Sequence, residues 1–223
     1  QAKRAALFAE TLREKILAPV PHVHVIFTIP RSLRGLFERE RKLLGLLARS
    51  AYESVRKTFA AALKRKDATP GFVAAIQTFG AFGPNFHPHI HAIASQGSFT
   101  KEGEFLPLPS IDPSVLEEVF RREVIARLHR AERLSDSFRK SLLGWVHSGF
   151  SIFAKQAVSA DEPEDVERLA RYIARPPIRI DAVQRTQNGK VQISTPRDPR
   201  TGATEILLDP LDWIHAITSQ IPD

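Results

Sequence analysis

Phe72-Val-Ala-Ala-Ile-Gln-Thr-Phe79 and Phe86-His-Pro-His-Ile-His-Ala-Ile-Ala-Ser95 are the two stretches that decide the fold of this chain. Both are rich in β-branched, aromatic and small apolar residues, and the short segment 80–85, rich in glycine and proline, joins them. Because strands joined by so short a connection pair antiparallel, the two stretches predict a β-hairpin. The hairpin in turn predicts an antiparallel sheet.

The segments around this hairpin alternate between helical and extended patterns. Helices are predicted over 3–17, 36–66, 113–131 and 135–157, over a stretch that begins near 161 and runs through Tyr172, and over 211–220. Further strands are predicted over 21–30, 178–186, 190–195 and 204–208, and a loop over 97–112. The predicted fold class is α+β: a central antiparallel sheet with flanking helices, then a C-terminal hairpin and helix.

The composition excludes several classes of protein. Hydrophobic residues make up 43% and charged residues 26% of the 223 residues, which is typical of a globular domain and enough for one core. The absence of cysteine excludes a disulfide scaffold, a thiolate zinc finger, an iron–sulfur site and a cysteine nucleophile. No apolar run is long enough for a membrane helix, and no signal peptide is recognisable. The chain starts at Gln1 and contains no methionine, so it is interpreted as an internal fragment or a trimmed chain.

The basic residues are unevenly distributed. Residues 1–66 carry 15 Lys and Arg against 5 Asp and Glu, whereas the whole chain has a net charge of only +7. An arginine-rich basic lobe is typical of proteins that bind polyanions, because each neutralised phosphate releases counterions. A solubilising helix surface explains the same pattern equally well.

The densest chemical signal is His87-Pro88-His89-Ile90-His91. Side chains alternate between the two faces of a strand, so the three histidines are expected on one face. Two imidazoles in this spacing can bind the same divalent cation, and a metal site is favoured over three structural histidines. His22-Val23-His24 is a weaker second pair, in which His22 is interpreted as a solvated edge residue.

Gln77 is the predicted third ligand. It lies in the strand that is expected to pair with the histidine strand, within an otherwise apolar stretch, where a buried amide needs a partner. A hydrogen bond to the backbone or to Thr78 would serve equally well. With His89 and His91, an amide oxygen would leave positions on the metal for phosphate and water. His24 and His87 are kept as additional ligands or as partners of the ligands.

Tyr172 lies in Arg168-Leu-Ala-Arg-Tyr-Ile-Ala-Arg175. Arg168 and Arg175 share its helical face and Arg171 precedes it, so the three arginines would favour a phenolate and hold a phosphate nearby. Tyrosine can act as a covalent nucleophile. An interfacial tyrosine with ordinary basic neighbours is the alternative, and the other tyrosine, Tyr52, is expected to pack in the core.

Three stretches in this order carry a resemblance to a known family: His24-Val-Ile-Phe-Thr-Ile-Pro30, Gln77-Thr-Phe-Gly-Ala-Phe-Gly-Pro-Asn-Phe-His-Pro-His-Ile-His91 and Arg171-Tyr-Ile-Ala-Arg-Pro-Pro177. From about residue 20 to 223, the chain resembles the HUH-type transposases of rolling-circle insertion sequences, including the common-region elements. The resemblance implies a palm-like or RRM-like (ferredoxin-like) sheet. It places this catalytic core at 1–177 and a packed C-terminal segment at 178–223.

The resemblance also implies a reaction. A tyrosine attacks single-stranded DNA at an element end or origin-like sequence, with Mg²⁺ or Mn²⁺ as cofactor, and forms a 5′-phosphotyrosine and a free 3′-hydroxyl. By position, Tyr172 resembles the nucleophile, and His89 and His91 resemble the metal ligands. The predicted DNA contacts are Asn85, Arg168, Arg171 and Arg175. The resemblance implies a bacterial cytoplasmic protein that acts at the nucleoid.

This chain departs from the family pattern in two ways. Arg168 stands where many of these transposases have a second tyrosine, so the chain resembles the single-tyrosine branch. The cysteine-rich zinc module that commonly precedes the core is absent from this sequence. The alternative function is a non-catalytic module that binds single-stranded DNA through its basic lobe and aromatics such as Phe82, Phe86 and Phe99. A zinc hydrolase is disfavoured, since no H-E-x-x-H motif occurs.

Overall fold

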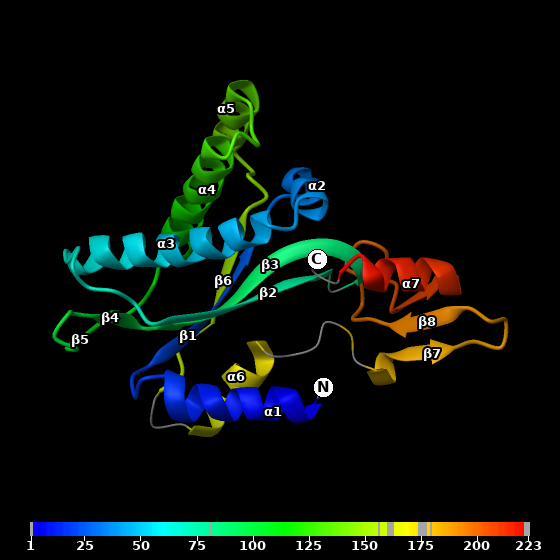
Figure 1. Ribbon diagram of the computed structural model, residues 1–223, viewed down its shortest axis with the longest axis horizontal. Coiled ribbons are helices and arrows are strands. Elements are labelled where there is room, and N and C mark those ends of the chain that lie inside the picture. The colour runs from blue at the N-terminus through cyan, green and yellow to red at the C-terminus, as the bar shows by residue number, and fades with distance from the viewer. Residues whose placement is uncertain are drawn as a thin grey trace.

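A four-stranded antiparallel sheet organises the chain, as the stretch 72–95 predicted (Figure 1). The computed structural model describes residues 2–80, 82–155, 157–159, 163–173, 178 and 180–220. The strand order is β2-β3-β1-β6, and every neighbouring pair is antiparallel. These strands are β1 (His22–Thr28), β2 (Phe72–Gly80), β3 (Gly83–Ser95) and β6 (Ser151–Ala154).

Helices cover both faces of this sheet, and two small sheets complete the fold. The helices are α1 (Ala2–Thr11), a π-helical turn (Leu12–Ile16), α2 (Arg31–Arg39), α3 (Leu43–Leu63), α4 (Pro113–Arg130), α5 (Asp136–Gly144), α6 (Pro163–Ile173), a 3₁₀ turn (Ile180–Ala182) and α7 (Pro210–Thr218). The remaining strands are β4 (Gly97–Phe99), β5 (Phe105–Pro107), β7 (Val183–Arg185), β8 (Val191–Ser194) and β9 (Glu205–Leu208). The predicted α+β class is confirmed.

The larger core lies between the sheet and the helices α2, α3, α4 and α5. Alternate residues of β1, among them Val25 and Phe27, point to this side, as do Ile90 and Ala92 of β3. They meet a stripe of buried residues on α3 that recur every fourth position, close to the helical period: Leu43, Leu47, Ala51, Val55 and Phe59. Burial of this apolar surface is the main source of the protein's stability.

The opposite face of the sheet packs against α1 and α6. Its buried apolar residues are Ala9, Leu12, Ile93, Leu169, Ala170 and Ile173. In Figure 1, α1 and α6 lie below the sheet, and α3 and α4 lie above it. Helix α6 carries Tyr172, so the fold brings the predicted nucleophile to one defined face.

Two sequence predictions about helices are wrong. The predicted helix 36–66 is two helices, because the backbone leaves the helical conformation at Glu40, whose φ is −129°. The Glu40 carboxylate binds the Arg133 guanidinium, 2.5 Å away, and the Lys42 ammonium, 3.0 Å away. The predicted helix 135–157 ends at Gly144, and its second half forms β6, which hydrogen-bonds along β1. The predicted loop 97–112 also contains a short hairpin, β4 and β5.

The C-terminal strands form a separate three-stranded antiparallel sheet, β7-β8-β9, which joins the end of the β2–β3 hairpin. Gly83 has a φ of +140°, and a methyl group there would come within 2.5 Å of Ile206 Cδ1. The Arg41 guanidinium lies 4.5 Å from the centroid of the Phe86 ring and donates a hydrogen bond to the Ser219 carbonyl. The C-terminal segment thus contacts the four-stranded sheet. None of the described helices combines the length and hydropathy needed to cross a membrane.

Candidate active site

The strand register places the predicted metal ligands in two adjacent cross-strand rows. Gln77 of β2 pairs with His89 of β3, which pairs with Thr28 of β1. In the next row, His91 pairs with Ala75 and Ile26. Directly paired residues share a face of the sheet. The structure therefore brings Gln77, His89 and His91 together on the face that α6 covers.

Hydrogen bonding determines which nitrogen of His89 is available for a ligand. Its Nδ1 lies 2.7 Å from the main-chain oxygen of His87. A carbonyl oxygen can only accept, so Nδ1 carries the proton and donates it. The neutral ring then keeps a lone pair on Nε2. This is the usual arrangement of a histidine whose second nitrogen binds a metal.

His24 contacts His91 directly. Its Nε2 lies 3.1 Å from Nδ1 of His91, and the two rings are stacked with centroids 5.3 Å apart. When Nδ1 of His91 donates to His24, Nε2 of His91 keeps its lone pair. The structure thus places His24 beside a predicted ligand. His22, interpreted from the sequence as solvated, is instead 4% exposed, so that interpretation is wrong.

The imidazoles of the site are held in the neutral form. Burial, together with the neighbouring His89 and His24, lowers the pKa of His91 to about 3. Burial, followed by the charge of Lys155, lowers the pKa of His24 to about 4. Burial also lowers the pKa of His89, and it brings the pKa of His87 to about 4. At neutral pH these rings keep a free lone pair, as ligand binding requires.

Tyr172 packs directly on the two paired histidines. Its ring centroid lies 4.9 Å from that of His24 and 5.5 Å from that of His91. Helix α6 is held against the sheet by Leu169, Ala170 and Ile173, three residues that flank the tyrosine along the helix. The helix therefore orients the phenol toward the histidine face.

Lys155 is a site residue that the sequence reasoning missed. Its Nζ lies 4.9 Å from the centroid of the Tyr172 ring, and its main-chain N–H donates to the His24 carbonyl, 3.0 Å away. It directly follows β6, a strand predicted as helix, and this error concealed its place beside β1. The only signal was the extended pattern Ser151-Ile-Phe-Ala154 before it.

The polar row at the end of the sheet extends beyond Gln77 and His89. Thr28 pairs with Ser151 of β6, and their hydroxyl oxygens lie 2.9 Å apart. Gln77, His89, Thr28 and Ser151 thus form a continuous row across all four strands. Sequence reasoning did not include Thr28 or Ser151, because neither belongs to a recognisable ligand type.

The predicted DNA-binding arginines of α6 pair with acids of the same helix. Arg168 lies 2.8 Å from Asp165, and Arg171 lies 2.5 Å from Glu167. Both remain mostly exposed, and the cation at the Tyr172 ring is Lys155 instead. Arg175 lies outside the described residues.

Asn85 lies at the end of the β2–β3 hairpin, two residues before His87. Asn85 is exposed, and its side-chain amide lies against Gly80. A methyl group at position 80 would clash with this amide. The glycine at position 80 therefore makes room for this amide at the end of the histidine strand.

Two imidazole nitrogens and one amide oxygen form a donor set that suits a divalent cation with few protein ligands. No group of three His, Cys, Asp or Glu side chains is placed to hold a metal within the described part of the chain. His89 and His91 would therefore need an oxygen ligand of another kind, and Gln77, directly opposite His89, has one. Nε2 of His87 is buried without a hydrogen-bond partner, so an additional nitrogen is also available.

Comparison with known proteins identifies the family. A family model described as "Putative transposase" matches residues 71–223, which include the histidine strand, α6 and the C-terminal sheet. The chain belongs to this transposase family.

Two curated relatives support this assignment. The chain is 27% identical over 216 residues to "Putative transposase y4qJ" of Sinorhizobium fredii, covering 86% of this chain and 52% of that protein. It is 26% identical over 233 residues to "Transposase for insertion sequence element IS801" of Pseudomonas savastanoi pv. phaseolicola, covering 96% of this chain and 54% of that protein. The chain thus spans about half the length of these relatives. No solved structure matches it.

Proposed function

We propose that this transposase nicks and joins single-stranded DNA with Tyr172 as the nucleophile and a divalent metal as the cofactor. The observation that carries the proposal is the packing of the Tyr172 ring against His24 and His91. A helix and a sheet meet here, and each contributes a group that the chemistry needs. A tyrosine with a purely structural role does not require two neutral imidazoles and an ammonium group against its ring.

The reaction exchanges one phosphodiester for another. The phenol oxygen of Tyr172 forms a bond to phosphorus as its proton is lost, and the bond from phosphorus to the 3′ oxygen of the leaving strand breaks. The leaving oxygen takes up a proton and becomes a 3′-hydroxyl, and the 5′ end stays on the tyrosine as a phosphodiester. Since no bond energy is lost to hydrolysis, attack by another 3′-hydroxyl reverses the step and joins the ends.

The proposed cofactor is Mg²⁺ or Mn²⁺, held by His89, His91 and the amide oxygen of Gln77. When bound, the ion would polarise the phosphate and offset the negative charge that develops on it. His24 orients His91 through the hydrogen bond between their ring nitrogens. The main-chain oxygen of His87 fixes the tautomer of His89. His24 is thus a positioning residue in this proposal.

The proposed chemistry is that of a single tyrosine. The chain contains two tyrosines, and Tyr52 lies on α3, the helix that packs on the opposite face of the sheet. Its ring contacts Phe72, with centroids 5.7 Å apart. Tyr172 is therefore the nucleophile that the histidine face supports, and the DNA substrate would place its action at the bacterial nucleoid.

Covalent capture tests this proposal. A labelled single-stranded oligonucleotide that carries the element end is incubated with the protein and Mn²⁺ or Mg²⁺, and the adduct is mapped by mass spectrometry. We expect an adduct on Tyr172 that Tyr172→Phe abolishes and Tyr52→Phe, the matched control, leaves intact. His89→Ala combined with His91→Ala should abolish the adduct while binding of single-stranded DNA remains.

Two outcomes would contradict the proposal. A Tyr172→Phe protein that forms the adduct at the wild-type rate rules out the assigned nucleophile. Binding of single-stranded DNA without cleavage under either metal favours the non-catalytic module. Of the aromatics considered for that alternative, Phe82 is 38% exposed, whereas Phe86 packs against the larger core and Phe99 packs against Phe105.

A further inference from the structure

A groove lined by arginines lies between α3 and α4, on the side of the sheet away from Tyr172. Its volume is about 500 Å³, and its lining residues are Gly45, Leu46, Arg49, Arg127, Arg130 and Ala131. Three of these six residues are arginines, and none is acidic. Arg49 and Arg130 are exposed and have no ion-pair partner within the described residues.

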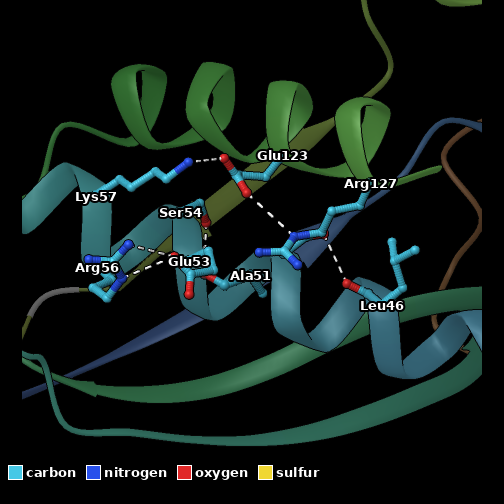
Figure 2. Close-up of polar contacts among 9 residues, drawn as sticks. Leu46, Ala51, Glu53, Ser54, Arg56, Lys57, Glu123 and Arg127 are labelled. Carbon is cyan, nitrogen blue, oxygen red and sulfur yellow. Dashed lines mark hydrogen bonds and ion pairs between the residues drawn. The ribbon is translucent and has the colours of Figure 1, made fainter. Parts of the chain in front are cut away.

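The arginine in the floor of this groove keeps most of its hydrogen-bonding capacity. Nε of Arg127 lies 3.4 Å from a Glu123 carboxylate oxygen, an ion pair that lacks hydrogen-bond geometry. The same carboxylate binds Lys57 of α3 through its other oxygen (Figure 2). No hydrogen bond to the terminal nitrogens of Arg127 is found in the described part of the chain. The buried Glu123 carboxylate therefore pairs with both Lys57 and Arg127, and the Arg127 guanidinium retains N–H donors for a ligand.

Basic residues continue along the seam between the two helices. Arg56 of α3 binds Glu53 of its own helix at 2.8 Å. This hydrogen bond, and to a smaller extent the charge of Glu123, raises the pKa of Arg56. Counting the groove and its extension, five basic residues (Arg49, Arg56, Lys57, Arg127 and Arg130) stand against two acids (Glu53 and Glu123). Because these basic residues are spread along the seam, their excess of positive charge matches an extended anion better than a compact one.

We propose that this α3–α4 groove is a second DNA-binding site, which holds the phosphate backbone of a DNA duplex. Arginine binds phosphate oxygens with two parallel N–H donors, so the lining suits phosphodiesters. The lining contains no aromatic residue, whereas strands bound through their bases require stacking side chains. The groove therefore suits the backbone of paired DNA, in which the bases are already stacked, and not an unpaired strand.

The groove and the proposed catalytic site lie on opposite sides of the sheet. Helices α3 and α4 pack on the opposite face of the sheet from the histidines, so the groove cannot hold the phosphate that Tyr172 attacks. It would hold the duplex next to the nick while the histidine face holds the unpaired strand. The inference rests on the proposed function only for the identity of the polyanion as DNA.

The test uses duplex binding in the absence of metal, so that no cleavage step enters the measurement. The affinity for a labelled blunt duplex is measured by fluorescence anisotropy at several salt concentrations. Removing one arginine that neutralises a phosphate should lower the slope of log affinity against log salt by about 0.9. The variant with Arg49→Gln and Arg130→Gln should therefore lower it by about 2. Arg127 is left intact because its removal would strip a buried carboxylate of a partner.

The control is Arg122→Gln combined with Lys140→Gln, which removes the same charge at two exposed positions outside the groove. We expect the control and Tyr172→Phe to keep the wild-type slope, and the groove variant to form the adduct with a short single strand normally. An unchanged slope in the groove variant overturns the proposal, and so does an equal decrease in the control. Loss of binding to oligo(dT) with intact duplex binding also overturns it. Failure of the adduct assay with a groove-dependent duplex slope would contradict only the proposed function.

Discussion

The two faces of the central sheet are built for different purposes. Toward α3 and α4 the sheet closes a core of 24 buried hydrophobic residues, whereas toward α1 and α6 only six are buried among the described residues. On the second face, positions that would carry valine or isoleucine in an ordinary sheet carry His24, His89 and His91 instead. The comparison shows that the larger core supplies most of the apolar burial that stabilises the fold. The histidine face buries fewer apolar residues because imidazoles occupy several of its positions.

The largest effect should come from the larger core. Phe120 is fully buried, and its ring centroid lies 5.0 Å from that of Phe27. Phe120→Ala should lower the free energy of unfolding by about 3–5 kcal/mol, and Leu169→Ala, on the other face, by about 2 kcal/mol. Urea denaturation of both variants measures the difference. Equal losses of stability would show that the two faces stabilise the fold alike.

The second effect is a loss of stability in acid that arises on the histidine face. The imidazole of His24 has a pKa of about 4 in the folded protein, against 6.5 in the reference state. Between these values the unfolded chain binds the proton more strongly, so stability is full above pH 6.5 and falls as the pH drops toward 4. We expect a loss on the order of 2 kcal/mol between pH 7 and pH 4.5.

Denaturation of His24→Gln at the two pH values tests this origin. The variant should lose part of the pH dependence, whereas His147→Gln, which changes an exposed histidine outside the strands of the sheet, should retain it. If both variants keep the wild-type profile, the acid sensitivity comes from elsewhere, and the comparison between the two faces does not extend to pH.

The smallest effect concerns the rate of the proposed reaction. Lys155→Gln removes the ammonium group beside the Tyr172 ring, and we expect adduct formation at saturating DNA to slow about tenfold. Lys155→Arg should restore most of the rate, because it restores the charge. The dissociation constant for single-stranded DNA should change much less than the rate. A change in affinity alone, with the rate intact, would make Lys155 an ordinary surface contact.

The hairpin and the row that contains Gln77 and His89 could be predicted because both depend on local sequence. Alternation along 86–95 determines that His87, His89 and His91 share a face, and a short connection determines that Gln77 lies on the neighbouring strand. The approach of Tyr172 to the same face depends on how α6 packs, which no local pattern specifies. The family resemblance supplied that expectation, and the contacts of Tyr172 with His24 and His91 agree with it.

The errors have a common physical cause, since each concerns a residue whose conformation depends on distant partners. Glu40 leaves the helix and binds Arg133, which is 93 residues away in the sequence. Ser151–Ala154 is extended because it pairs with β1, although only four residues form the strand. The place of Lys155 follows from this pairing, so it could not be predicted once the strand was taken for a helix.

The polar row that contains Gln77 and His89 is also the last regular row of the sheet. Strand β1 ends at Thr28, β6 begins at Ser151, and the pairing of β2 with β3 shifts register after Gln77. Beyond this row the four strands no longer form one continuous surface. A polymer could therefore cross the end of the sheet from side to side without threading a free terminus. In the proposed function, such a site would suit a phosphate in the interior of a long or circular strand as well as one near an end.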